Sequence, residues 1–321
     1  MTAWIVRLGD AYRALLALAF GVIGPRAAYA FSGTLARLLY RLAPPIRQRS
    51  ETQCAAALGG RVPAARIRRI AEASFVHRVW NLTDLLLASR WLRRDALDRV
   101  GGRLPAALLD EILSAQRRRK PIILLTGYFG PYDLLPLLLG YNGVAAVAVY
   151  RRHINAAFDR YRTRVRAMGG CELVPVEAAL DRLPRELEAG RTVAILSDHH
   201  DPRRGMDATF LGLPTRAART VGLLACRHNA DVVVAGVRRV RRSFRFEILA
   251  LDTIRPADWA DAGDPVVHVT ERTLRGLERL VLSDPEQYLW AYERWGRGAI
   301  PARDPVAPAS NRDPGSASAP Q

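Results

Sequence analysis

The stretch Lys120-Pro-Ile-Ile-Leu-Leu-Thr-Gly-Tyr-Phe-Gly-Pro-Tyr-Asp133 determines how the rest of the chain is interpreted. An apolar run over 121–125 breaks at Thr126-Gly127, and a second apolar segment covers 134–139. This pattern predicts a buried strand, a tight turn and then a helix. In an open α/β sheet, side chains in such a turn lie at the carboxyl end of a strand, where ligands usually bind.

Downstream of this stretch, apolar runs of strand length alternate with segments of helical pattern. We predict strands over 144–150, 172–176 and 192–196, with helices over 155–168 and 178–188 between them. Strands separated by helices of this length imply parallel βαβ units. We therefore expect an α/β fold with a mostly parallel central sheet flanked by helices.

We predict three regions along the chain: membrane-associating helices over 1–44, the α/β domain over 45–301, and a disordered tail over 302–321. The tail consists mainly of Pro, Ala, Ser, Asp and Gly without apolar periodicity. The other expected elements are helical regions over 46–100 and 105–116, a helix over 216–227, strands over 232–237 and 243–251 that can pair antiparallel, and a long helix over 265–282.

The amino-terminal segment is mostly apolar and small. Its uninterrupted apolar run, 14–24, is about half of the roughly 20 residues that a membrane-spanning helix needs. A signal peptide is the alternative, with Arg7 upstream and Ala28-Tyr-Ala30 as a cleavage-like site, but Asp10 interrupts its apolar part. We expect a helix that lies at the membrane interface, with its arginines near the head groups.

The chain is strongly basic, with 48 Lys and Arg residues against 31 Asp and Glu residues and a net charge of +17. Lys120 is the only lysine. Such a chain is attracted to anionic partners, among them phospholipid head groups and acidic carrier proteins. The three cysteines, Cys54, Cys171 and Cys226, are too few and too widely spaced for a disulfide framework, which fits a reducing compartment.

Residues 128–133, Tyr-Phe-Gly-Pro-Tyr-Asp, resemble the motif His-Phe-Gly-Asn-Trp-Glu of a known family. This is the late acyltransferase family of lipid A biosynthesis, the lauroyl/myristoyl transferases of the lysophospholipid acyltransferase superfamily. The spacing, Phe129, Gly130 and the carboxylate of Asp133 fit the motif, whereas Tyr128 replaces its histidine.

Four further segments resemble this family in the same order along the chain. Tyr150-Arg151 resembles its Tyr-Arg-Pro element, and Asp198 resembles its Asp-Gln element, with His199 in place of the glutamine. Residues 205–215 resemble its Gly…Phe-Phe-Gly-Xaa-Pro-Ala turn. Residues 284–295 are similar to its Pro-Glu-Gln-Trp/Tyr-x-Trp-x-His-x-Arg terminus, again with tyrosine where histidine is usual.

The resemblance implies transfer of a fatty acyl chain from a thioester to a hydroxyl group. In the family, the motif histidine is the base and the motif carboxylate orients it. Arg151 lies at a predicted strand end, where a guanidinium can hold a phosphate or an oxyanion. The candidate catalytic residues are therefore Tyr128, Asp133, Arg151, Asp198 and His199.

Three interpretations of Tyr128 remain open, because a tyrosine with a pKa of about 10 is mostly protonated near neutral pH. The proton of the acceptor can pass to another residue, with His199, His200 and His153 as candidates. Tyr128 can itself act, as a phenolate or as a hydrogen-bond donor to the carbonyl. Finally, the protein can be a catalytically inactive paralogue that binds a lipid or an acyl group.

The resemblance also implies partners and a location. The donor is an acyl carrier protein or acyl-CoA, whose thioester is a co-substrate, and the acceptor is a membrane lipid such as a lipid A precursor. The expected location is the cytoplasmic face of the inner membrane, at its anionic surface, as a peripheral protein or with a single amino-terminal anchor. No cofactor is expected.

Two other classes of site are not expected. Asp198-His-His-Asp201 has no third cluster at ligand spacing, so we predict no metal site. The arginine-rich run 238–242 lacks interleaved aromatic residues, so we predict a basic sheet edge and no nucleic-acid partner.

Overall fold

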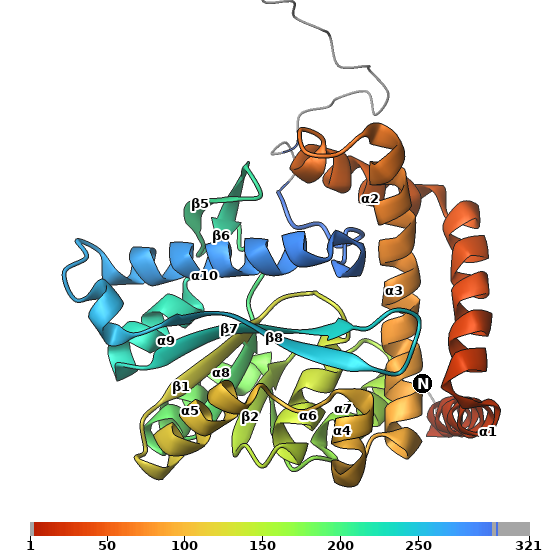
Figure 1. Cartoon of the computed structure of the whole chain (residues 1–321), viewed down its shortest axis with the longest axis horizontal. Helices are drawn as coiled ribbons and strands as arrows, with labels where there is room; N and C mark the ends of the chain where they lie inside the picture. The colour runs from red at the N-terminus through yellow and green to blue at the C-terminus, as the bar shows by residue number, and fades with distance from the viewer. Residues whose placement is uncertain (1–2, 297–299, 301–321) are drawn as a thin grey trace, which may run out of the picture.

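A six-stranded sheet forms the centre of the computed structural model, which describes residues 3–296 and 300, with side chains from residue 18 onward. The strand order is β3-β2-β4-β1-β7-β8. Figure 1 labels β1, β2, β7 and β8 of this sheet. The strands are β1 (Ile122–Thr126), β2 (Ala146–Tyr150), β3 (Glu172–Pro175), β4 (Thr192–Leu196), β7 (Asp231–Arg239) and β8 (Phe246–Ile254), and a separate hairpin consists of β5 (Met206–Phe210) and β6 (Leu213–Ala217).

The sheet is parallel from β3 to β7, and β8 joins β7 antiparallel. β1 lies inside the sheet, between β4 and β7, with Leu124 opposite Ala194 on one side and Val233 on the other. The predicted mostly parallel sheet and the predicted antiparallel pairing of the last two strands are both confirmed.

Helices cover both faces of this sheet (Figure 1). The α-helices are α1 (Ala3–Leu42), α2 (Pro44–Leu58), α3 (Ala64–Trp91), α4 (Leu97–Val100), α5 (Ala106–Arg117), α6 (Leu135–Tyr141), α7 (Ala156–Ala167), α8 (Ala179–Glu188), α9 (Thr220–His228) and α10 (Pro265–Ser283). Short 3-10 helices are η1 (Arg94–Ala96), η2 (Tyr132–Leu134), η3 (Val176–Ala178), η4 (Pro256–Trp259) and η5 (Pro285–Gln287).

The two faces of β1 explain why residues 122–125 are an unbroken apolar run. Ile122 and Leu124 belong to a core with α5, α6 and part of α3, whereas Ile123 and Leu125 belong to a core with α8, α9 and α10. Successive side chains of a strand point to opposite faces, so a strand buried on both faces has no polar positions.

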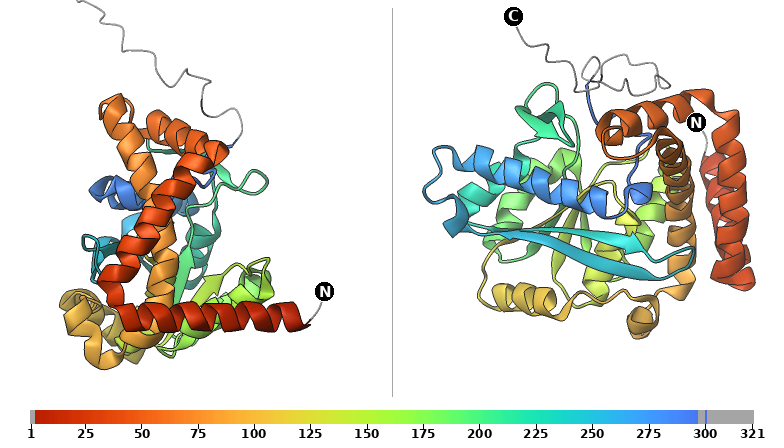
Figure 2. Two further views of the ribbon diagram at one scale, coloured as in Figure 1. Left: turned by 90° about the vertical axis from the view of Figure 1, so that its right-hand side faces the viewer. Right: turned by 45° about the horizontal axis from the view of Figure 1, so that its top comes forward.

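α1 consists of two helical halves joined by a kink at Gly24, whose φ of 78° is outside the helical region, followed by Pro25. The second half packs against α3, where Tyr29 and Ala36 are buried. Figure 2 shows the first half turning sharply away from the second. Among the described residues, no helix combines the length and the hydropathy that a membrane crossing requires.

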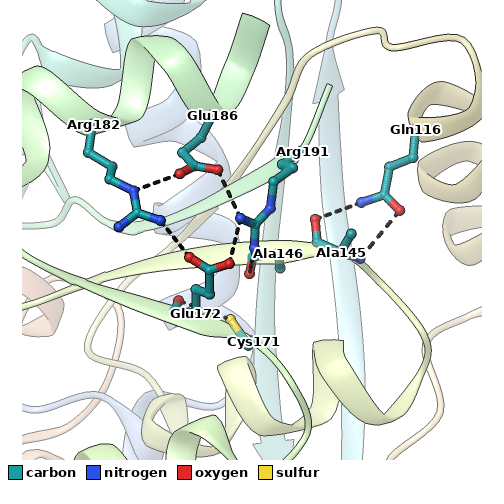
Figure 3. Close-up of polar contacts among 8 residues, drawn as sticks. All are labelled: Gln116, Ala145, Ala146, Cys171, Glu172, Arg182, Glu186 and Arg191. Atoms are coloured by element: carbon teal, nitrogen blue, oxygen red, sulfur yellow. Dashed lines mark hydrogen bonds and ion pairs between the residues drawn. The ribbon is translucent and has the colours of Figure 1, made fainter. Parts of the chain in front are cut away.

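The outer edge of the sheet is held by an ion-pair network (Figure 3). Glu172, at the start of β3, accepts hydrogen bonds from Arg182 at 2.6 Å and from Arg191 at 2.8 Å, and both arginines also pair with Glu186. Because Arg182 and Glu186 come from α8 and Arg191 precedes β4, the network ties the edge strand to its neighbours.

The prediction of one helix over 216–227 is wrong at its start. Arg216 and Ala217 belong to β6, which pairs antiparallel with β5, and α9 begins only at Thr220. The hairpin turns at Leu211-Gly212, where both residues have positive φ. The division of the chain into three regions stays a prediction, and its tail, 302–321, lies outside the described residues.

Candidate active site

Two segments meet at the carboxyl edge of the sheet because β1 and β4 are parallel neighbours. Thr126 pairs with Leu196 at the end of both strands, so the turn after β1 and the loop after β4 leave the sheet side by side. Tyr128 is on the first segment, and Asp198 and His199 are on the second. The topology therefore brings these three predicted residues together.

Asp198 fixes the turn that carries Tyr128. Its carboxylate, 1% exposed, accepts a hydrogen bond from the backbone N–H of Tyr128 at 2.8 Å. A Cβ atom on Gly127 would lie 2.9 Å from the same Oδ2 atom, so only glycine allows this close approach.

Tyr128 and His199 form a hydrogen-bonded pair. The Tyr128 hydroxyl lies 3.0 Å from Nε2 of His199, and the two rings pack edge to face. The ring of Tyr292, from the closing segment of the chain, lies 4.9 Å from that of Tyr128 and 5.8 Å from that of His199. The backbone N–H of Leu289 donates to the Tyr128 carbonyl at 3.0 Å, which anchors this closing segment to the turn.

The protonation states of the pair follow from burial. Burial, with the charge of Asp198 as the next cause, raises the pKa of Tyr128, so its hydroxyl keeps its proton at neutral pH. Burial lowers the pKa of His199, an effect that Asp198 opposes and Arg151 reinforces. A neutral imidazole beside a protonated phenol is suited to accept a proton, whereas the phenolate form of Tyr128 is disfavoured.

Asp133 has different partners. It lies on η2, is buried, and accepts hydrogen bonds from Nη2 and Nε of Arg162 at 3.0 and 3.2 Å, together with a close ion pair to Arg166. Within the described part of the chain, Asp133 makes no hydrogen bond to Tyr128 or His199. Its carboxylate thus joins η2 to α7 instead of orienting the histidine.

A small apolar cavity adjoins this ion pair between the carboxyl ends of β1, β2 and β4. Tyr132 and Arg166 line it, with Thr126 and Tyr150 among the strand residues. Its volume is about 40 Å³, close to the roughly 30 Å³ that one water molecule occupies in the liquid. A fatty chain would need this slot to widen.

The other predicted residues lie at different distances from the pair. Arg151, exposed one residue beyond β2, lowers the pKa of both Tyr128 and His199 and is therefore within electrostatic range. His200 turns toward the hairpin, where its Nδ1 lies 3.5 Å from the Thr215 hydroxyl. His153 is exposed and accepts a hydrogen bond from the backbone of Asn155 at 3.0 Å.

Sequence reasoning missed the residues that hold Asp133. Arg162 and Arg166 are four positions apart on α7, and such residues share one face of a helix. In the structure that face lies against η2, in the turn after β1, where both arginines contact Asp133. The helical spacing was therefore a usable signal, but an arginine-rich helix in so basic a chain is normally interpreted as a solvated face.

The fold and this site define an α/β protein with a neutral histidine, a tyrosine and a buried carboxylate at the carboxyl ends of adjacent parallel strands. Residues 3–297 match the bacterial lipid A biosynthesis acyltransferase family, and the chain belongs to that family. No curated protein sequence matches the chain. Membership implies acyltransferase activity as the general class, while the replacement of the motif histidine by Tyr128 stays a prediction.

The described residues contain no group of three or more His, Cys, Asp or Glu side chains arranged to hold a metal ion.

Proposed function

We propose that the protein transfers a fatty acyl chain from a thioester to a hydroxyl group of a lipid acceptor, with His199 as the base. The observation that carries this proposal is the 3.0 Å contact between the Tyr128 hydroxyl and Nε2 of His199. The lowered pKa of His199 supports it, because a neutral histidine is ready to take a proton at neutral pH.

In this proposal Tyr128 relays the proton. As the acceptor oxygen attacks the thioester carbonyl and the new C–O bond forms, its proton passes to the Tyr128 oxygen, and Tyr128 gives its own proton to His199. No free phenolate forms, which agrees with the raised pKa of Tyr128. The oxyanion then collapses, the C–S bond breaks, and the proton returns through Tyr128 to the leaving thiolate, giving an ester and a free thiol.

The other residues have supporting roles in this proposal. The positive charge of Arg151 acts on the pair and is placed to stabilise the developing oxyanion. Asp198 holds the turn through the Tyr128 backbone. Asp133 is a positioning residue, because its contacts with Arg162 and Arg166 fix η2 against α7.

The proposed donor is an acyl carrier protein or acyl-CoA, and the proposed acceptor is a lipid A precursor or another glycolipid. The net charge of +17 supports an acidic carrier and an anionic membrane as partners. Exposed apolar side chains on α1, with Val22 at 78% and Leu42 at 70%, support attachment to the cytoplasmic face of the inner membrane. The reaction as written uses no metal or other cofactor.

The test is an acyl-transfer assay with labelled acyl donor and a total lipid extract. We expect turnover by the wild type and a fall of about 10²- to 10⁴-fold for His199→Gln and for Tyr128→Phe. His153→Gln is the matched control and keeps the wild-type rate. On the acid side, the rate falls at a pH below the ordinary histidine pKa of about 6.5, because burial lowers the pKa of His199.

Two results would overturn the proposal. A wild-type protein that binds lipid but shows no turnover is the inactive binding paralogue. A His199→Gln variant with full activity shows that another group takes the proton.

A further inference from the structure

A second and much larger cavity opens away from the Tyr128–His199 pair. Its volume is about 900 Å³, and it lies between α1, α3, the turn between β7 and β8, and η5. Figure 1 shows that turn ending beside α3, with α1 on the other side of α3. Its charged lining residues are Arg37, Arg66, Arg69, Arg239, Arg241, Arg242, Glu72, Asp284 and Glu286.

The lining has a surplus of positive charge that ion pairs leave largely uncompensated. Arg66 pairs with Glu286 at 2.8 Å, and Arg239 pairs with the buried Asp84. The remaining four arginines of the lining, Arg37, Arg69, Arg241 and Arg242, have no ion pair within the described part of the chain, and they outnumber the two remaining carboxylates, Glu72 and Asp284. Four guanidinium groups that converge on one cavity from three elements favour an anionic ligand.

The inner wall of the cavity is held by contacts of the buried Arg239. Arg239 donates to Nδ1 of His77 at 2.7 Å, and its guanidinium lies 5.6 Å from the centre of the Trp80 ring. Burial, followed by the charges of Arg239 and Arg242, lowers the pKa of His77 to about 2. The imidazole is therefore neutral, and the positive charge of the cavity comes from arginine alone and does not vary near neutral pH.

We propose that this cavity binds the phosphate-bearing head group of an anionic lipid. Its volume is within the range of about 300–1,000 Å³ that small-molecule sites occupy. Arginine presents a planar fork that matches phosphate oxygens. Arg37 of the lining is followed on α1 by Leu38 and Leu39, which are 53% and 43% exposed. The acyl chains of the same lipid therefore have apolar surface next to the phosphate site.

The proposed site does not depend on acyl transfer. None of its lining residues belongs to the Tyr128–His199 pair, and binding is measured without turnover, so either proposal can fail while the other holds.

The test is calorimetric titration of the full chain with dihexanoyl phosphatidylglycerol as a monomer, and separately with inorganic phosphate. The variant Arg241→Gln/Arg242→Gln removes two exposed charges from the turn between β7 and β8. The matched control, Arg117→Gln/Arg118→Gln, removes two neighbouring exposed arginines at the end of α5, a helix that contributes no residue to the cavity lining and lies at the other end of the sheet from α3 in Figure 1.

We expect the wild type and the control to bind the lipid equally, and the Arg241/Arg242 variant to bind it about tenfold more weakly or worse. Arg69→Gln, on α3, should weaken binding in the same direction, which a local change in the turn would not do. Melting temperatures of all variants check that each is folded.

Three results would overturn the proposal. In the first, the wild type binds no lipid; in the second, both double variants lose affinity equally, which indicates diffuse attraction by net charge. Alternatively, inorganic phosphate binds and depends on Arg241 and Arg242 while the lipid does not, in which case the cavity recognises free phosphate.

Discussion

At the residue scale, the proposed relay through Tyr128 predicts a specific rescue. Replacing His199 by glutamine removes the base, but the double variant Tyr128→His/His199→Gln places a histidine where the resembling motif has one. We expect the single His199→Gln variant to lose about 10²- to 10⁴-fold in rate and the double variant to recover at least about tenfold in the rate of the chemical step, because the new imidazole takes the acceptor proton directly. Single-turnover kinetics with labelled thioester measure this recovery.

Tyr128→His alone, which keeps His199, is the control for this experiment and should be active. If the double variant stays as inactive as His199→Gln, the histidine position is not interchangeable, and His199 acts by positioning instead of by proton transfer.

A second residue-scale prediction concerns His77 and acid. Burial, with the charges of Arg239 and Arg242, lowers its pKa to about 2, and its Nδ1 accepts a hydrogen bond from Arg239. The unfolded chain, with a histidine pKa of about 6.5, therefore binds this proton more tightly, so stability falls as the pH drops below about 6.5. Between pH 7 and pH 5, the wild type should lose about 2 kcal/mol more than His77→Gln.

Denaturant unfolding at both pH values measures this difference, and glutamine is a suitable replacement because its amide oxygen can still accept from Arg239. Equal losses in both proteins would show that His77 takes up a proton in the fold or that the cavity opens in acid.

These residues show which parts of the candidate site could be predicted from the sequence. Tyr128, Asp198 and His199 could be predicted to lie together, because residues at the ends of neighbouring parallel strands share one edge of the sheet. The partners of Asp133 were only partly predictable: helical spacing places Arg162 and Arg166 on one face of α7, but the packing of α7 against η2 is what assigns that face to Asp133.

At the element scale, the turn after β1 is fixed by a glycine. Gly130 has a φ of +53°, and a Cβ atom there would lie 1.9 Å from the carbonyl oxygen of Val237. The Asn81 side chain donates to the Gly130 carbonyl at 2.7 Å, and the Gly130 N–H donates to the Gln287 carbonyl at 2.9 Å. The turn therefore cannot move away from Val237 without breaking these hydrogen bonds.

Gly130→Ala should therefore cost more than the strain of a left-handed alanine, which is about 1–2 kcal/mol. Gly143→Ala is the matched control, because Gly143 has a φ of +82° but nothing within 4 Å of the added Cβ. We expect the free energy of unfolding to fall by at least about 2 kcal/mol more for Gly130→Ala than for Gly143→Ala. Similar losses in the two variants would show that the turn yields to the extra atom.

The elements themselves were largely predictable, with one instructive exception. β4 was predicted at its observed bounds, because a short apolar run that follows Gly190 and ends at the polar residues Ser197-Asp198 has few alternatives. The hairpin β5–β6 was missed, because Met206–Phe210 alternates apolar and polar residues over only five positions and its pairing with Leu213–Ala217 depends on a turn at Leu211-Gly212 with two positive φ values. Hairpins of this kind are specified by turn conformation more than by hydrophobic pattern.

At the scale of the whole molecule, α1 has apolar side chains that do not pack against the core. Its second half buries Tyr29 and Ala36 against α3 but leaves Phe31 and Leu38 at 61% and 53% exposure. A soluble protein seldom leaves a row of large apolar side chains in water without a partner. The arginine-lined cavity beside the same helix supplies positive charge next to this apolar surface.

This arrangement predicts how the protein attaches to lipid bilayers. In flotation experiments with vesicles that contain phosphatidylglycerol, Phe31→Glu/Leu38→Glu should bind at least about tenfold more weakly, because burial of each apolar side chain is worth about 1.5–3 kcal/mol. Leu180→Glu/Leu223→Glu is the matched control, with the same change of charge at exposed leucines on α8 and α9. If the control loses as much affinity, net charge drives attachment and the α1 surface has no special part in it. If neither double variant loses affinity, the protein meets the membrane through another face, and the lipid acceptor must reach the Tyr128–His199 pair from that side.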